Sequence, residues 1–181
     1  MDKKKIIIIA AVIFGTLVVI GGTVAFFGWR ADKESKVEVT IVAGTGVCEL
    51  SSDNNVSIQP TSTKDSGRII KLNARQELGQ KAIITWNMTI NKINGLQDKT
   101  FIYELVNTTT GMTYGSGNFE SLGEGSTIEF TNVNEQLDFN KEYEFTLYLW
   151  IDGENGDNPI SMADQDFNFK LNCELKSIDT E

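Results

Sequence analysis

The sequence lacks histidine, the side chain on which most acid, base and nucleophile chemistry near neutral pH depends. This absence excludes Ser-His-Asp and Cys-His nucleophilic systems, as well as the HExxH zinc site. Pairs of carboxylates can hydrolyse glycosidic bonds, but none of the 25 acidic residues is set apart from the others as such a pair. We therefore predict that the protein is not an enzyme and needs no cofactor.

One acidic stretch, residues 152–159 with the sequence DGENGDNP, has the oxygen-rich composition of a calcium site. Its candidate ligands are Asp152, Glu154 and Asp157. The stretch departs from the EF-hand pattern, because Gly156 stands where an oxygen ligand is needed and Asp157 stands where glycine makes the sharp turn. A solvated hairpin is the favoured interpretation, and calcium binding is the weaker alternative.

Cys48 and Cys173 lie near the two ends of the predicted globular part. Because strand residues alternate between faces, Cys48 shares a face with Leu50, and Cys173 shares one with Leu171 and Leu175. Both thiols then point into one core, which predicts a disulfide between the first and last strands. The alternative is two separate buried thiols that pack as small apolar side chains. A disulfide is typical of a protein outside the cytoplasm.

Tyr148 and Trp150 lie on the face of their predicted strand opposite its aliphatic residues. Large aromatic side chains on a solvated face are typical of a surface that binds a protein or a sugar. The competing interpretation is that a neighbouring strand or a loop covers them. The sequence leaves both interpretations open.

Apolar residues recur at every second position through much of the chain after residue 36, a period typical of half-buried β-strands. The strongest patterns predict core strands over residues 81–91, 142–152 and 166–175. Weaker patterns predict strands over residues 37–42, 47–50, 68–74, 100–106, 112–117 and 126–131. Turn-forming Asn-Gly, Gly-Ser and Asp-Asn steps separate these runs. We predict an all-β fold, an immunoglobulin-like antiparallel β-sandwich over residues 37–181, with a jelly roll as the alternative.

The N-terminus predicts export from the cytoplasm. Three lysines at positions 3–5 precede an uncharged apolar run over residues 6–27, and a helix of this length spans about 33 Å, close to one bilayer core. Residues 1–30 are therefore a transmembrane anchor or a signal peptide cleaved after Ala25, with residues 31–36 as a juxtamembrane linker. The lysines place the rest of the chain outside the cell. The net charge of -9 argues against nucleic acid as a partner.

Residues 37–42 (VEVTIV) are strongly β-prone, and residues 43–46 (AGTG) separate them from the next predicted strand as a flexible hinge. This strand can pair within its own sheet, or it can leave and add to the sheet edge of a second copy. In the second case Val37, Val39 and Ile41 fill pockets of the neighbour. Head-to-tail donation of this kind propagates into a filament.

Residues 21–27 (GGTVAFF), at the end of the apolar run, resemble the export signal of the TasA/camelysin family of Gram-positive biofilm-matrix proteins. Residues 60–74, 81–86 (KAIITW) and 148–153 (YLWIDG) resemble sandwich strands of that group. The resemblance implies an exported domain whose N-terminal strand completes the sheet of its neighbour in a surface fibre. The two cysteines depart from the family pattern, and without histidine the metallopeptidase activity described for camelysin-like proteins is not carried over.

These observations together predict a structural protein of the cell surface or extracellular matrix in a Gram-positive-type bacterium. Its expected partners are copies of itself or other surface proteins, and the membrane through residues 6–27 if the segment is retained. The alternative function is a membrane-anchored adhesion or ligand-binding domain that uses Tyr148 and Trp150 or the acidic loop.

Overall fold

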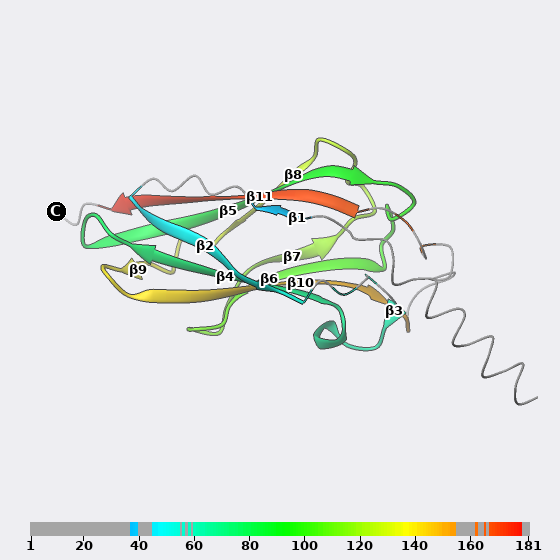
Figure 1. The fold of residues 1–181 in the computed structure, drawn as a ribbon, viewed down its shortest axis with the longest axis horizontal. Helices are drawn as coiled ribbons and strands as arrows, with labels where there is room; N and C mark the ends of the chain where they lie inside the picture. The colour runs from blue at the N-terminus through cyan, green and yellow to red at the C-terminus, as the bar shows by residue number, and fades with distance from the viewer. Residues whose placement is uncertain are drawn as a thin grey trace, which may run out of the picture. The chain divides into compact units, whose positions relative to one another are not determined.

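The computed structural model describes residues 37–39, 45–54, 56, 58, 60–154, 162, 165 and 167–178, with residues 37–39 described by their backbone (Figure 1). The chain divides into two compact units, Met1–Glu34 and Ser35–Glu181. The predicted anchor or signal (residues 1–30) and the predicted linker (residues 31–36) lie outside the described residues. No helix within the described residues has the length and apolar content needed to cross a membrane.

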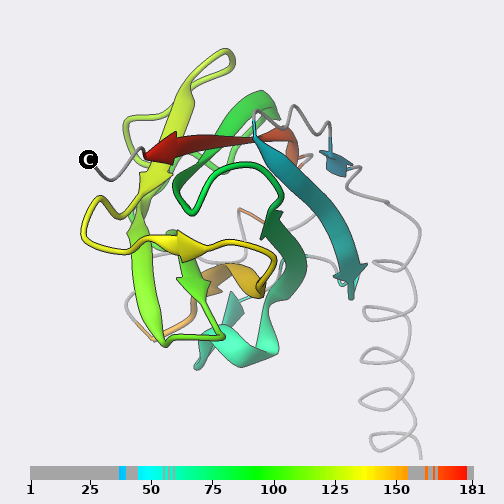
Figure 2. The same ribbon diagram turned by 90° about the vertical axis from the view of Figure 1, so that its left-hand side faces the viewer.

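Two sheets build the unit Ser35–Glu181, and Figures 1 and 2 show them facing each other. The first has the order β1-β11-β5-β8, with β9 also paired to β5; the second has the order β2-β4-β10-β6-β7, with β3 also paired to β10. Among the described strands, neighbours are antiparallel except β1 with β11 and β3 with β10. The bounds are β1 Val37–Val39, β2 Gly46–Asp53, β3 Pro60–Thr61, β4 Arg68–Gln76, β5 Lys81–Ile93, β6 Phe101–Asn107, β7 Met112–Asn118, β8 Thr127–Thr131, β9 Leu137–Asp138, β10 Glu142–Asp152 and β11 Phe167–Ile178.

The core lies between the two sheets, as the period-two pattern of the sequence requires. In β5 every second residue from Ala82 to Ile90 is at most 1% exposed, and in β10 every second residue from Tyr143 to Ile151 is at most 2% exposed. Trp86 of β5 meets Phe145 of β10 across the sheets, with 5.7 Å between the ring centroids. The predicted inward faces of these strands and the all-β fold class are confirmed.

The strands at the edges differ most from the prediction. β1 covers Val37–Val39, and residues 40–42 of the predicted strand lie outside the described residues. The prediction that Leu50 shares the buried face of Cys48 is wrong in part, because Leu50 is 42% exposed. β2 is the outermost strand of its sheet, and its register with β4 shifts between Leu50 and Ser52, which leaves this side chain without a covering neighbour. The sequence also does not predict the two-residue strands β3 and β9, or the 3-10 helix η2 (Lys64–Ser66).

The sandwich has two ends, formed by the turns between strands. The Leu78 end contains the starts of β2, β5, β7 and β10 and the end of β11, and it faces the viewer in Figure 2. The Asp98 end contains the starts of β4, β6, β8 and β11. We define the Leu78 end as residues 45–47, 75–81, 107–112, 132–142 and 176–178. The Asp98 end is defined as residues 53–54, 56, 60–68, 92–100, 118–126, 150–154 and 167–168.

Candidate functional site

The outer edge of β11 is the strongest candidate site. One edge of this strand pairs with β5 along its whole length, from Phe167 to Ile178. Along the other edge, the strand that the described residues provide is β1. It pairs with three of the twelve residues of β11, Phe169–Leu171. A sheet edge with unpaired backbone groups is a template for an added strand.

The structure places β1 in its own sheet, in parallel with β11. Val37 is in register with Phe169, and Val39 is in register with Leu171. Ile41, the third predicted contact residue of this strand, lies outside the described residues. The placement matches the interpretation in which residues 37–42 begin their own sandwich, and it also identifies the slot that a strand donated by another copy would occupy.

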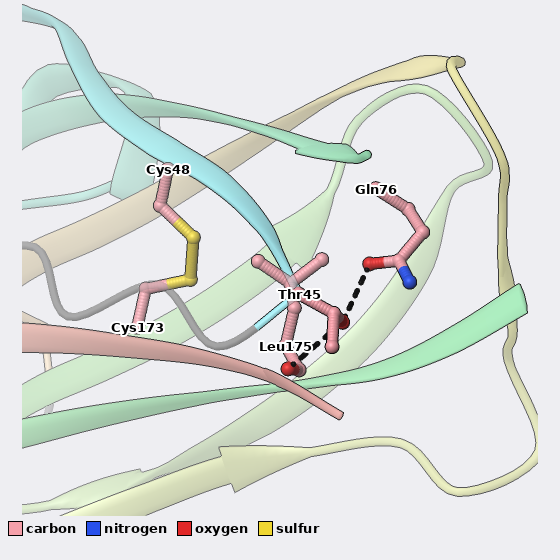
Figure 3. The surroundings of a disulfide bond; sticks show 5 residues. All are labelled: Thr45, Cys48, Gln76, Cys173 and Leu175. Carbon is pink, nitrogen blue, oxygen red and sulfur yellow. Dashed lines mark hydrogen bonds between the residues drawn. A yellow bond between two sulfur atoms is a disulfide. The ribbon is translucent and has the colours of Figure 1, made fainter. Parts of the chain in front are cut away.

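Thr45 fastens the start of β2 to both sheets (Figure 3). Its amide donates to the carbonyl of Leu175 in β11 at 3.1 Å, and its carbonyl accepts the amides of Glu77 and Leu78 at 3.1 and 2.9 Å. Its hydroxyl donates to Gln76 Oε1 at 3.0 Å or to the Leu175 carbonyl at 3.2 Å. Gln76 is itself fully buried, and its Nε2 donates to the Leu78 carbonyl. None of these hydrogen bonds involves β1.

A disulfide joins the same two edges, as the sequence predicts. Cys48 of β2 is bonded to Cys173 of β11 with 6.4 Å between the Cα atoms, and both residues are 1% exposed (Figure 3). The two cysteines are 125 residues apart, so on the chain-entropy model the bond stabilises the fold by about 4–5 kcal/mol. A buried disulfide of this kind indicates an oxidising, extracytoplasmic environment.

We call β1, Thr45, the disulfide and β11 the exchange edge. Three connections hold β11 in place without β1: its ladder with β5, the Cys48–Cys173 bond and the Thr45 hydrogen bonds. The parallel ladder with β1 adds three residues at the margin of the sheet. Short segments at the margin of a sheet generally open at a small fraction of the global unfolding free energy.

Tyr148 and Trp150 lie on the outer face of the second sheet, and the segment before β4 shields part of each. Nζ of Lys64, in η2, lies 4.8 Å from the centroid of the Tyr148 ring and 2.6 Å from Glu104 Oε2. The hydrogen bond that Lys64 donates to Glu104 raises the pKa of Lys64. A Cβ added at Gly67 would meet the Cβ of Trp150 at 2.8 Å, so the backbone of this segment lies directly against Trp150. A loop therefore covers part of both aromatic residues, which are half-buried.

A shallow groove begins where this cover ends. It has a volume of about 370 Å³ and runs across the outer faces of β10, β6 and β7. Its lining combines one indole ring with an aliphatic side chain, two charged side chains and small polar residues. The lining residues are Trp150, Ile102, Lys99, Glu104, Ser116, Gly117 and Asn118.

Two of the three candidate calcium ligands, Asp152 and Glu154, belong to the described residues. Oδ1 of Asp152 accepts the amide of Glu154 at 3.0 Å, a local turn contact of the kind that aspartate makes in loops. Asp157 lies outside the described residues. Among the residues that the structure does describe, no three acidic or cysteine side chains lie close enough together to hold a metal ion.

A buried ion pair at the Asp98 end was not predicted. Arg68 is 1% exposed, and its Nη2 and Nε lie 2.7 and 3.2 Å from the two carboxylate oxygens of Asp53. The pair ties the end of β2 to the start of β4. The alternating pattern of β4 could have predicted the burial of Arg68, because this residue falls on the same face as Ile70 and Leu72, both of which are fully buried.

Polar side chains are also buried at the Leu78 end. Asn107 is fully buried, and its Nδ2 donates to Glu135 Oε1 at 3.2 Å, which fastens the loop between β8 and β9. Burial raises the pKa of the neighbouring Tyr114, and the charge of Glu135 acts in the same direction. The ring of Tyr114 packs against Phe145 with 5.1 Å between centroids. These contacts support the fold at this end.

Comparison of the chain with protein-family models gives no match, and comparison with curated proteins gives none either. The function is therefore inferred from two surface features of the protein. The exchange edge offers backbone hydrogen bonds to a strand, and the groove at Trp150 offers an aromatic and polar surface to a ligand.

Proposed function

We propose that this protein is a non-enzymatic structural component of a cell surface or extracellular matrix, exported from a Gram-positive-type cell, whose copies associate by exchanging β1. The observation that carries the proposal is the exchange edge. A short parallel strand occupies an edge that the disulfide and Thr45 keep assembled without it. A strand from a second copy meets the same backbone groups in the same register.

Two further features support this assignment. The buried disulfide fits an environment outside the cytoplasm, which agrees with the export that residues 1–30 predict. The chain also has no histidine, which removes the usual general base near neutral pH. The membrane-anchored and the released forms of the protein would both present the exchange edge to neighbouring copies.

The proposed fold class is an immunoglobulin-like sandwich rather than a jelly roll. Domains of that class pack an inter-sheet disulfide against a buried tryptophan. Here Cys173 is in register with Trp86 on the adjacent strand, and Trp86 is 1% exposed. The bond also crosses from one sheet to the other.

Two chains test strand exchange, one beginning at Phe26 and one beginning at Gly44. The first is expected to form filaments, and the second to stay folded and monomeric by circular dichroism and light scattering. A synthetic peptide of residues 33–43 should raise the melting temperature of the shorter chain, because a ligand of the folded state stabilises it. The same peptide with Val39→Pro should not, since proline removes a backbone donor. Filaments from the shorter chain, or a shorter chain that does not fold, would contradict the proposal.

A second function, ligand binding by an adhesion domain, is supported by the groove at Trp150. The half-buried indole of Trp150 lines the groove with Asn118 and Ser116 and offers stacking and hydrogen bonding to a sugar ring or a peptide. Glycan-array binding by a monomeric chain, lost in Trp150→Ala and kept in Lys71→Ala on the same face, would favour this function over strand exchange. Absence of binding by the wild-type chain would argue against it.

A further inference from the structure

Exposed apolar side chains are distributed unequally between the ends of the sandwich. Five large ones among the described residues belong to the Leu78 end, and they are Val47 (39% exposed), Leu78 (63%), Met112 (42%), Val133 (64%) and Phe139 (55%). The Asp98 end has one, Val56 (43%). Single exposed apolar residues are ordinary on protein surfaces, but several at one end of a domain are typical of a contact surface.

Three of these residues lie near the end of β4 along the backbone. Val47 is in register with Arg75 on the neighbouring strand, and Phe139 forms a bridge with Gln76. Leu78 follows two residues later, in the turn that Thr45 fastens. These residues adjoin the exchange edge, because the backbone of Thr45 is hydrogen-bonded both to the turn at Leu78 and to Leu175 of β11.

Charge distinguishes the two ends as well. The Leu78 end has four basic residues (Arg75, Lys81, Lys141, Lys176) and four acidic ones (Glu77, Glu135, Asp138, Glu142). The Asp98 end has four basic residues (Lys64, Arg68, Lys92, Lys99) and seven acidic ones (Asp53, Asp65, Asp98, Glu120, Glu124, Asp152, Glu154). In a chain with a net charge of -9, the Leu78 end is thus the end at which two copies approach with least repulsion.

The geometry of strand exchange brings the donor's Leu78 end close to the acceptor, and this step rests on the proposed function. β1 runs parallel to β11, so in a neighbour's slot a donated β1 runs toward the neighbour's Leu78 end. Val39 and Thr45 are six residues apart, and six extended residues span at most about 22 Å. Val39 of the donor and Leu171 of the acceptor are partners on adjacent strands about 5 Å apart, so Thr45 of the donor, at the donor's own Leu78 end, lies within about 27 Å of Leu171.

From these observations we infer that the Leu78 end is a self-association surface whose partner is a second copy of this chain. Leu78, Phe139 and Val47 form its apolar centre, and charged residues of both signs form its rim. In strand exchange this surface lies beside the point at which the chain passes from one copy to the next. It adds burial of apolar side chains to the short backbone ladder that β1 supplies.

The test compares the full chain in mild detergent with a Leu78→Asp/Phe139→Asp double variant by analytical ultracentrifugation. A Val56→Asp variant is the matched control, since Val56 is a similarly exposed apolar residue at the opposite end. We expect the double variant to raise the apparent dissociation constant of the assembly at least about tenfold, because two buried apolar side chains are replaced by charges. The control should assemble like the wild type, and all three should keep the same melting temperature.

The outcomes separate this inference from the proposed function. Unchanged assembly of the double variant, in a chain that does exchange β1, overturns the role of the Leu78 end and leaves strand exchange standing. An equal loss of assembly in the Val56→Asp control also overturns it, because the effect would then be one of added charge. A wild-type chain that stays monomeric at every concentration overturns both.

Discussion

The two ends of the sandwich close the core in different ways. At the Asp98 end, Phe101, Phe119 and Phe167 pack against one another with centroid distances of 4.2 to 5.1 Å, and each is at most 1% exposed. The buried pair of Arg68 and Asp53 lies at this end as well. At the Leu78 end, the closure consists of hydrogen bonds around Thr45 and Gln76, while Phe139 is left 55% exposed.

This difference indicates that the Asp98 end contributes to the stability of the fold, whereas the Leu78 end is suited to association with a partner. Phenylalanine contributes to the core at one end, whereas at the other end it is presented to solvent with charges of both signs around it. An acidic end with a buried aromatic cluster needs no partner to be stable. An exposed apolar end beside the entry point of β2 gains from one. Substitutions at matched positions of the two ends should therefore have different effects on the unfolding free energy.

The largest contrast is expected for the same substitution made at each end. Phe119→Ala removes a fully buried ring from the aromatic cluster and should lower the unfolding free energy by about 3–5 kcal/mol. Phe139→Ala should change it by less than about 0.5 kcal/mol, because that ring is mostly in solvent. Urea denaturation measures both. Equal losses at the two positions would show that the Leu78 end is part of the core.

One ion pair at each end should also differ in its contribution to the unfolding free energy, with the larger contribution at the Asp98 end. Asp53→Ala leaves the guanidinium of Arg68 buried without this carboxylate and should cost about 3 kcal/mol. Glu77→Ala removes the partner of Arg75, which is 46% exposed, and should cost less than about 1 kcal/mol. Thermal unfolding of the two variants gives the comparison, and a similar cost for both would contradict the assigned burial of Arg68.

A smaller effect is expected at the hydrogen bonds of the Leu78 end. Gln76→Ala removes the side chain that accepts from Thr45 and donates to the Leu78 carbonyl, which should cost about 1–3 kcal/mol. The backbone around Thr45 should then exchange its amide hydrogens faster, while amides of β5 keep their protection. Faster exchange throughout both sheets would mean that this residue supports the whole core rather than the entry of β2.

The smallest effect concerns pH at the Asp98 end. The Thr100 hydroxyl and amide donate to Oδ1 of Asp98 at 2.7 and 2.8 Å, and the hydroxyl hydrogen bond is the larger cause that lowers the pKa of this carboxyl. A lowered pKa gives stability that is present above the usual carboxyl pKa of about 4 and is lost as the pH falls through the folded-state value.

Asp98→Asn should therefore be less stable than the wild type at pH 6, by less than about 0.5 kcal/mol because the group is largely solvated. The difference should shrink as the pH falls below about 4. Melting temperatures from pH 2 to pH 6 measure it. A difference that stays constant over this range would contradict the assignment.

The sequence predicts what depends on local alternation. The inward faces of β5, β10 and β11 follow from period two, and so does the pairing of Cys48 with Cys173. What it misses depends on neighbours distant in sequence. Leu50 has an inward phase but lies on an edge strand, and η2 covers Tyr148 because residues 60–67 cross the outer face of β10.

The candidate site shows the same limit. The β-propensity of residues 37–42 predicts a strand, but the parallel register with β11 and the hydrogen bonds of Thr45 depend on where the last strand lies. The exposed apolar end also could not be predicted, because Leu78, Phe139 and Val47 belong to three separate segments that the fold brings to the end of β4.

A cysteine-mixing experiment tests the transfer of β1 between copies. Glu38 of β1 is in register with Lys170 of β11. A Glu38→Cys chain is mixed with a Lys170→Cys chain, and a chain with both substitutions serves as the intramolecular control. Strand exchange predicts a disulfide between the two different chains that forms as the mixture assembles. If the double variant forms its bond within one chain and the mixture forms none between chains, β1 stays in its own sheet and strand exchange is contradicted.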